Sequence, residues 1–302
     1  MIDFVARNRL VAAFAAVYVL WGSTYLAVAL GLQSIPPLVL MGTRSTIAGV
    51  VLLAVEQFRR PGPLQAGPWV AAAVGGILLF VGCHGTLAYA QQHVPSGLAA
   101  VILATIPFWI VLLNTVAPGD RRPSMWALVA LAPGLAGVAL IAWRGSSHED
   151  SIDPKMVLLL AGSAFSWAAG SLVSQRQGTS TPALALSGMQ LVCGGVVLLI
   201  LGALTGEMRH FSLADVTVVS WAGLAYLTFA GSVIGFTAYV WLLDNAPGPL
   251  VATYTFINPI IAVVLGWALL GERLSPRMLI GAALVIGSVV AVWRLEPFDA
   301  HT

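Results

Sequence analysis

Long apolar stretches, separated by short polar ones, follow one another along the whole chain. With windows of about 19 residues, this pattern predicts about ten membrane-spanning helices. A helix of about 20 apolar residues crosses a hydrocarbon core of about 30 Å, so each stretch is long enough to span it. The predicted spans are Leu10–Leu30, Leu38–Phe58, Trp69–Ala90, Gly97–Val116, Met125–Trp143, Met156–Gln175, Ala183–Leu204, Val216–Leu243, Leu250–Leu270 and Met278–Trp293. The pattern therefore predicts an all-α, polytopic membrane protein.

The second half of the chain repeats the first. Residues 95–121 match residues 247–273 without a gap, and each copy has a proline near its middle and ends on Gly-acid-Arg. GTRSTIAGVVLL, which starts at Gly42, matches GMQLVCGGVVLL, which starts at Gly188, in the same way. A repeat of this length determines the architecture before any single residue is interpreted.

Each copy holds five of the predicted spans. Because this number is odd, the second copy enters the membrane from the opposite side, and the two copies are predicted to be inverted repeats. In transporters built in this way, the substrate binds in a central cavity near the midplane, between the halves. The predicted division is a first five-helix repeat at 1–145, a polar linker at 146–154, and a second five-helix repeat with a short tail at 155–302.

The composition narrows the classes of function. Hydrophobic residues make up 59% of the 302 residues and charged residues only 9%, whereas about a quarter of a soluble domain is charged. The net charge of +2 is spread over loops, so the expected partners are the lipid bilayer and a small-molecule substrate, not nucleic acid. No His-Glu-x-x-His or Ser-His-Asp pattern occurs, and the sequence predicts no enzyme, no cofactor and no metal site.

Lys and Arg residues in short loops predict the orientation in the membrane. With the N-terminus inside, the cytoplasmic segments of the first half carry Arg59, Arg60, Arg121 and Arg122. The second half is biased in the wrong direction, as expected if the first half determines how an upside-down copy inserts. Both termini are therefore predicted to be cytoplasmic.

Aromatic residues at midplane depth are the first candidates for a substrate site. Trp21 and Trp167, which a weaker third match pairs with each other, lie about eleven residues into their spans. Tyr25 follows Trp21 by one helical turn. Such rings either pack helices together or contact a ligand. The candidate substrate-binding residues are Trp21, Tyr25, Arg44, His84, Tyr89, Trp109, Trp167, Tyr239, Tyr254 and Asn258.

Arg44 is the only charged residue well inside a predicted span. An arginine within a bilayer costs about 2.5 to 17 kcal/mol, so it normally faces protein or water and has a partner. One interpretation is that Arg44 snorkels to the headgroups. The other is that it faces the cavity, where its charge suits a substrate carboxylate.

The remaining polar candidates also have two interpretations each. His84 and Asn258 either form ordinary hydrogen bonds within the bundle or line the cavity. Pro107 and Pro259, at matching positions, either only kink their helices or act as paired hinges. No Asp or Glu lies near the centre of a predicted span, so transport is predicted to be facilitated or coupled through His84.

The combined pattern resembles the EamA-type transporters of the drug/metabolite transporter superfamily. The resemblance rests on WGSTYLA in the first span, the arginine of GTRSTIAG, the prolines of the fourth and ninth spans, and GER at the end of the ninth. Asp120, in place of the family's usual Glu, is a departure that concerns topology. Within the superfamily, the chain is most similar to the YddG-type exporters of aromatic amino acids.

The resemblance implies a ten-helix protein of the bacterial inner membrane that exports amino acids, aromatic or large apolar ones, by alternating access through a central cavity. The alternative is an exporter of other small metabolites or of hydrophobic drugs through the same cavity. A monomeric state is compatible with the sequence. A receptor or an enzyme subunit would need a soluble domain or a catalytic cluster, and the sequence holds neither.

Overall fold

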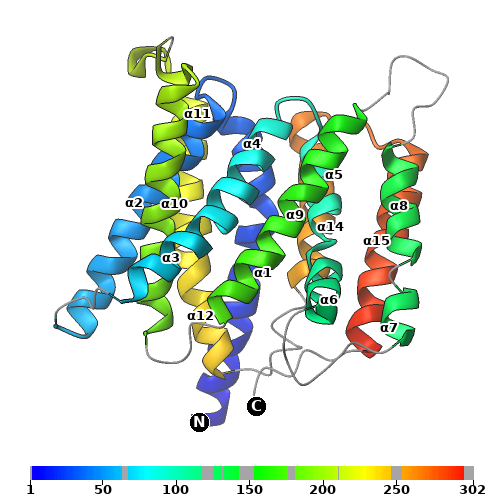
Figure 1. Ribbon diagram of the computed structural model, residues 1–302, viewed down its shortest axis with the longest axis horizontal. Coiled ribbons are helices and arrows are strands. Elements are labelled where there is room, and N and C mark those ends of the chain that lie inside the picture. The colour runs from blue at the N-terminus through cyan, green and yellow to red at the C-terminus, as the bar shows by residue number, and fades with distance from the viewer. Residues whose placement is uncertain are drawn as a thin grey trace.

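The computed structural model describes residues 2–62, 67–116, 125–130, 132–142, 153–175, 181–209, 211–245 and 254–295. Within these ranges every regular element is a helix, and Figure 1 shows the helices lying side by side as a bundle. The all-α class predicted from the sequence is confirmed for this part of the chain.

The helices of the first half are α1 (Ile2–Gly31), α2 (Pro37–Arg59), α3 (Pro68–Gly76), η1 (Ile77–Gly85), α4 (Thr86–Ala90), α5 (Ser96–Leu103), α6 (Ile106–Val116), α7 (Met125–Ala130) and α8 (Ala132–Ala142). Those of the second half are α9 (Pro154–Gln175), α10 (Ala183–Leu204), η3 (Glu207–Arg209), η4 (Leu213–Asp215), α11 (Val218–Ala225), η5 (Tyr226–Ile234), α12 (Gly235–Asn245), α14 (Tyr254–Leu270) and α15 (Pro276–Leu295). η1 and η5 are π-helices, and η3 and η4 are short 3-10 helices.

Six helices of the described residues are long and apolar enough to cross a membrane. They are Asn8–Gly31, Pro37–Arg59, Pro68–Ala90, Pro154–Ser174, Ala183–Leu204 and Val218–Tyr239. Shorter apolar helices occupy Ser96–Ile110, Ile257–Leu270 and Pro276–Ala291, where the sequence predicts further spans. The expectation of a membrane protein with several spans is therefore confirmed.

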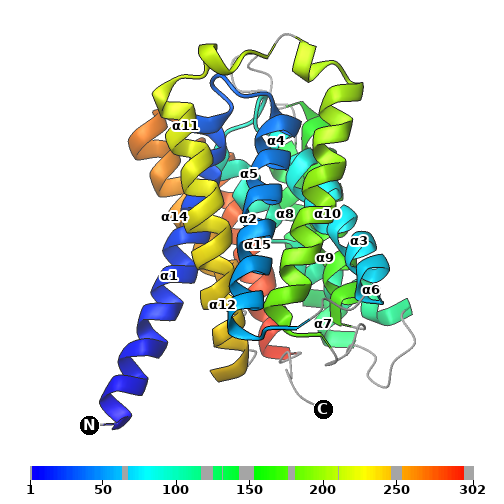
Figure 2. The same cartoon turned by 90° about the vertical axis from the view of Figure 1, so that its left-hand side faces the viewer.

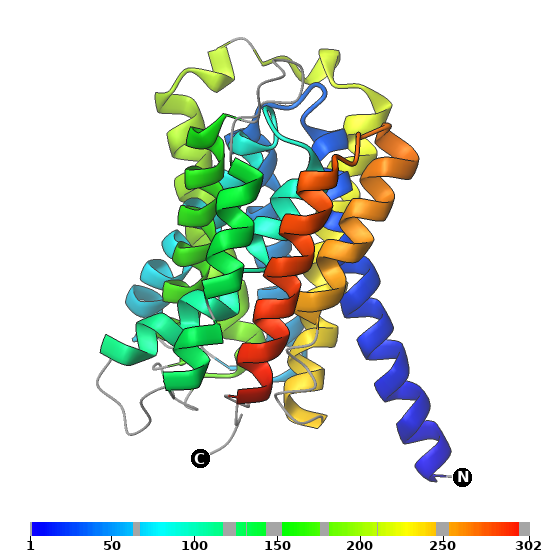
Figure 3. The same ribbon diagram turned by 90° about the vertical axis from the view of Figure 1, so that its right-hand side faces the viewer.

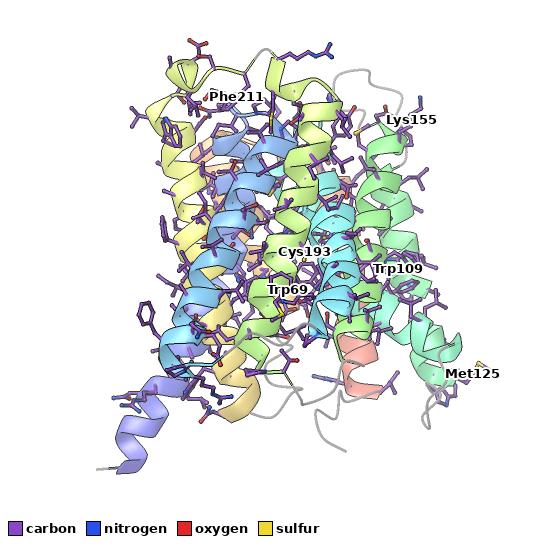
Figure 4. The ribbon with its side chains drawn as sticks, turned by 60° about the vertical axis from the view of Figure 1, so that its left-hand side comes forward. Trp69, Trp109, Met125, Lys155, Cys193 and Phe211 are labelled. Atoms are coloured by element: carbon purple, nitrogen blue, oxygen red, sulfur yellow. The ribbon has the colours of Figure 1, made fainter. Side chains whose placement is uncertain are left out.

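The first helices of the two halves run in opposite directions. α1 begins, and α15 ends, at the lower end of the bundle in Figure 1. The first turns of α1 extend beyond the other helices at this end, as Figures 2 and 3 show. α9 instead begins at the upper end, where Figure 4 shows Lys155 and Phe211, whereas Met125 of α7 lies at the lower end.

Some sequence predictions concern residues outside the described ranges. Arg121 and Arg122, which contribute to the predicted orientation, belong to this group, as does Asp120. The predicted linker at 146–154 is described only from residue 153.

α2 packs along α10, its counterpart in the repeated sequence, and glycines let the two backbones approach closely. A Cβ atom on Gly49 would lie 2.7 Å from the Val192 nitrogen and 2.8 Å from the Gly188 oxygen. A Cβ atom on Gly195 would lie 2.6 Å from the Thr46 nitrogen. Because these neighbours are backbone atoms, they cannot give way as the end of a flexible side chain can.

Each half contains a π-helix of nine residues, η1 between α3 and α4 and η5 between α11 and α12. Such segments are rare and are often found at functional sites. In each π-helix, one backbone carbonyl accepts a hydrogen bond from a serine hydroxyl. Ser166 Oγ donates to the Leu78 oxygen at 2.8 Å, and Ser232 Oγ donates to the Leu227 oxygen at 2.9 Å. The hydrophobic pattern of the sequence does not predict these segments.

Two carboxylates of the second half bind the first turns of two helices of the first half. Glu207 Oε2 accepts hydrogen bonds from the Leu38 and Val39 nitrogens of α2, at 2.9 and 3.3 Å. The carboxylate of Glu272 accepts from the first two backbone nitrogens of α5, at 2.6 and 3.1 Å. These N–H groups have no partner within their helices, and the helix dipole favours an anion there.

The two predicted hinge prolines have different surroundings. α5 ends at Leu103 and α6 begins at Ile106, so Pro107 lies in the first turn of a new helix. Pro259 lies inside α14, which continues through it. The matching prolines thus coincide with one helix break and one uninterrupted helix, and their action as hinges stays a prediction.

Candidate functional site

A cavity lies within the bundle and is lined from both halves of the chain. Its empty space, including the part that opens to the outside, is about 660 Å³. The lining residues are Trp21, Thr24, Tyr25, Val28, Arg44, Cys83, His84, Leu87, Leu103, Ile106, Trp167, Phe236, Tyr254 and Asn258.

Most of the candidate residues from the sequence come together here. Seven of them line the cavity: Trp21, Tyr25, Arg44, His84, Trp167, Tyr254 and Asn258. An eighth, Tyr239, does not line the cavity but packs against Trp21, with its ring centroid 5.0 Å from that of Trp21. The fold thus gathers residues from α1, α2, η1, α9 and α14 that are distant in the sequence.

The other two candidates lie elsewhere. The Tyr89 side chain is 47% exposed and packs against the ring of His93. The Trp109 ring packs against Phe108 and Phe165, and Figure 4 shows Trp109 at the side of the bundle. Neither residue lines the cavity described above.

Aromatic rings form one wall of the cavity around Trp21. The ring centroid of Trp21 lies 5.5 Å from that of Phe236 and 5.0 Å from those of Tyr239 and Tyr254. Its Nε1 donates a hydrogen bond to the Gly231 oxygen of η5, at 3.0 Å. Tilted and edge-on contacts of this kind are the favoured geometries of aromatic pairs. These contacts fix the position of the Trp21 ring at the cavity.

Arg44 supplies a positive charge to the cavity. Its side chain is only 5% exposed, so it lies at the cavity wall and does not extend to the end of its helix. Nε donates to Ser232 Oγ at 3.0 Å, and Nη1 contacts Met41 Sδ at 3.6 Å. No carboxylate of the described residues forms an ion pair with Arg44. A buried arginine without an acidic partner is suited to bind an anionic group of a ligand.

Two further buried polar atoms belong to residues that line the cavity. His84 Nδ1 and Asn258 Oδ1 have no hydrogen-bond partner in the described part of the chain. The His84 ring packs against the rings of Phe80 and Trp167, with centroids 5.3 and 5.2 Å away. Because buried polar atoms are nearly always hydrogen-bonded, these two are suited to contact a polar group of a ligand.

Seven lining residues were not among the candidates: Thr24, Val28, Cys83, Leu87, Leu103, Ile106 and Phe236. A helical face predicts some of them, because residues three, four and seven positions after Trp21 share its side of the helix. This rule finds Thr24 and Val28 beside Tyr25. Leu103, Ile106 and Phe236 carry no such signal, since they reach the cavity only through the packing of other helices.

The arrangement suits a ligand with an apolar, ring-sized body and one anionic group. Aromatic walls contact the body, and Arg44 is placed for the anion. In the described residues, no group of three or more His, Cys, Asp or Glu is positioned to hold a metal ion.

Comparison with known proteins agrees with this architecture. A model of the EamA-like transporter family matches the chain twice, over residues 9–143 and 154–294. The "Uncharacterized inner membrane transporter YedA" of Escherichia coli (strain K12) is 33% identical over 279 residues, which cover 92% of this chain and 88% of that protein. The "Probable amino-acid metabolite efflux pump" of the same strain is 26% identical over 306 residues, covering 93% of each.

A solved structure, described as "Crystal structure of protein", has a TM-score of 0.65 against this chain. The match covers 95% of this chain and 98% of the other at 20% sequence identity. At this identity the likeness supports the fold alone.

Proposed function

This chain belongs to the EamA-like transporter family of membrane proteins, and from that premise we propose that it exports amino acids with aromatic or large apolar side chains. The substrate binds in the cavity between the halves and crosses the inner membrane by alternating access. Relatives named as an inner membrane transporter and as an amino-acid metabolite efflux pump support the membrane and the substrate class.

The observation that carries this proposal is that Arg44 is buried and has no carboxylate partner in the described residues. The charge lines the cavity, and no carboxylate of the described residues pairs with it. An isolated buried charge is unfavourable, so a ligand that brings a carboxylate into the cavity is favoured over one that lacks it. Every amino acid carries such a group.

The preference for aromatic side chains rests on the aromatic part of the lining. Trp21, Phe236 and Tyr254 offer ring faces and edges to a ligand. Stacking or edge contact with such rings contributes about 0.5 to 1.5 kcal/mol beyond burial. The buried Asn258 oxygen, which lacks a protein partner in the described residues, provides an acceptor for the substrate ammonium group.

We further propose the inverted-repeat topology for the membrane-bound protein, with about ten spans and both termini in the cytoplasm. Two matches of one family model, and the opposite directions of α1 and α9 in Figure 1, support the repeat. The arginines of the loops in the first half support the orientation.

Counterflow into proteoliposomes of the purified protein tests the substrate. We expect labelled phenylalanine to exchange with internal phenylalanine or tryptophan, and to be inhibited less by phenethylamine, which lacks the carboxylate. Arg44→Ala should lose most of the exchange, while Arg60→Ala, at the exposed C-cap that follows the same helix, should retain it.

Absence of exchange with any amino acid would contradict the proposal. If non-amino-acid metabolites or hydrophobic drugs then inhibit or exchange, the alternative substrate class is correct. An Arg44→Ala variant that exchanges phenylalanine as the unmutated protein does would show that Arg44 is not the carboxylate partner.

A further inference from the structure

Ser232 is the side chain that holds Arg44 at the cavity wall. The Ser232 Oγ accepts a hydrogen bond from Arg44 Nε at 3.0 Å, and both side chains are buried. The bond joins α2 of the first half to η5 of the second. Ser232 itself does not line the cavity, so it can influence a ligand only through Arg44.

The π-helix orients Ser232 for this contact. The Ser232 hydroxyl donates its proton to the Leu227 oxygen, five residues earlier, at 2.9 Å. In the same segment Thr228 donates instead to the Leu224 oxygen, four residues earlier, at 2.8 Å. A hydroxyl has one proton and two lone pairs, so a Ser232 that donates to Leu227 is left as an acceptor for Arg44.

The contact determines which edge of the guanidinium remains for a ligand. Arg44 Nε is bonded to Ser232, and Nη1 contacts Met41 Sδ at 3.6 Å. Nη2 has no hydrogen-bond partner in the described part of the chain. Because the guanidinium is planar, one bond at Nε restricts the direction of the Nη atoms that would meet a carboxylate. A group held in this way loses less conformational freedom on binding.

We propose that Ser232 is a positioning residue that determines how strongly the cavity prefers substrates with a carboxylate. Its hydroxyl aligns Arg44, and the π-helical register of η5 aligns the hydroxyl. The identity of the substrate rests on the proposed function, whereas the alignment of Arg44 does not.

The alignment is tested without any substrate by labelling with phenylglyoxal, a reagent that modifies arginine. Peptide mass spectrometry gives the rate at Arg44 separately from the other arginines. In Ser232→Ala, we expect a several-fold faster reaction at Arg44, because the guanidinium is no longer held at Nε and its Nη atoms, which the reagent attacks, can reorient. Ser232→Thr should restore the slow rate, and Thr228→Val, which removes a hydroxyl from the same π-helix, should leave it unchanged.

The effect on selectivity is tested by counterflow of phenylalanine with phenylalanine or phenethylamine as competitor. Ser232→Ala should raise the half-saturating concentration of phenylalanine by roughly threefold to tenfold with little change in maximal rate, and should reduce the preference for phenylalanine over phenethylamine. Ser232→Thr should restore both values. A general loss of fold would instead lower the maximal rate and the melting temperature.

The outcomes separate the two proposals. An unchanged labelling rate at Arg44 in a folded Ser232→Ala variant overturns the positioning role, whatever the substrate is. If labelling at Arg44 is faster in Ser232→Ala but the unmutated protein shows no preference for a carboxylate, the proposed substrate class and the selectivity role are both refuted. A carboxylate preference that depends on Arg44 but not on Ser232 leaves the proposed function intact and refutes the inference.

Discussion

Trp21 and Trp167 occupy matching positions of the repeated sequence, but the fold gives them different surroundings. Trp21 donates to the Gly231 oxygen and has three aromatic neighbours. A Cβ atom on Gly235 would lie 2.5 Å from Trp21 Nε1, so this glycine makes room for the indole. Trp167 packs against His84 and has no such hydrogen bond in the described residues. Trp21 is therefore held by ring contacts and a hydrogen bond of its indole, whereas Trp167 is held by the His84 ring and by packing against two hydrophobic clusters.

The two tryptophans should differ when each is replaced by alanine. Trp21→Ala removes a packed, hydrogen-bonded ring and should destabilise the protein by about 3 to 5 kcal/mol in addition to weakening transport. Trp167→Ala, which breaks no hydrogen bond of the indole in the described residues, should destabilise the protein less than Trp21→Ala and should weaken binding of phenylalanine by roughly threefold to tenfold. Melting temperature and counterflow below saturation measure the two effects. Unmutated transport rates in both variants would show that neither ring contacts the substrate.

Glu207 introduces a pH dependence into stability. Desolvation raises the pKa of its carboxyl above the ordinary 4.5, and the hydrogen bonds from the Val39 and Leu38 nitrogens oppose this only in part. Because the pKa is higher in the folded protein, this contribution to stability is fully present below about pH 4.5. It is lost as pH rises through the raised value.

Glu207→Gln keeps an acceptor oxygen and has no charge to desolvate. Relative to the unmutated protein, its melting temperature in detergent should therefore increase as the pH is raised from 4 to 8. Glu207→Ala, which removes the acceptor, should lower stability by about 1 kcal/mol. A difference between Glu207→Gln and the unmutated protein that does not change with pH would contradict the assignment.

At the scale of helices, the contact between α2 and α10 depends on close backbone approach. The same two helices carry matching sequence, so the contact joins the two copies of the repeat. Gly49 and Gly195 lie at matching positions and face backbone atoms of the opposite helix. Small residues are the usual means by which membrane helices pack closely, because lipid offers no hydrophobic driving force between them.

Gly49→Ala tests this contact. The added methyl group would lie 2.7 Å from a backbone nitrogen of α10, so the helices must separate. We expect destabilisation of about 1 to 3 kcal/mol, measured as a lower melting temperature in detergent. Gly162→Ala in α9 is the matched control, since nothing lies within 4 Å of the added Cβ. Equal stability of the two variants would show that α2 and α10 do not pack this closely.

For the whole molecule, the proposed inverted repeat predicts that both termini lie on the same side of the membrane. Reporter fusions measure it directly. Cytoplasmic reporters placed after Arg122 and at the C-terminus should be active, and a reporter placed between Gly145 and Lys155 should be inactive. Termini on opposite sides of the membrane would contradict the inverted repeat.

Much of the architecture could be predicted from the sequence because a bilayer permits few solutions. Apolar stretches of spanning length have to form helices that satisfy their own backbone groups. The repeated sequence then indicates two related halves. Arg44 is recognisable because a charge is unusual inside such a helix, and Trp21 because its ring lies at midplane depth. Both residues line the cavity. The sequence alone thus predicted the helical class, the membrane location and half of the residues that line the cavity.

The side-chain contacts that would produce selectivity depend on the tertiary structure. Arg44 and Ser232 are 188 positions apart, and their hydrogen bond depends on the π-helical register of η5, which hydrophobicity does not report. Trp21 and Trp167 differ although their sequence positions match. Tyr89 and Trp109 are aromatic residues of apolar helices, but neither lines the cavity. A sequence pattern reports the environment of a helix, whereas only the packing of distant helices determines which side chains meet.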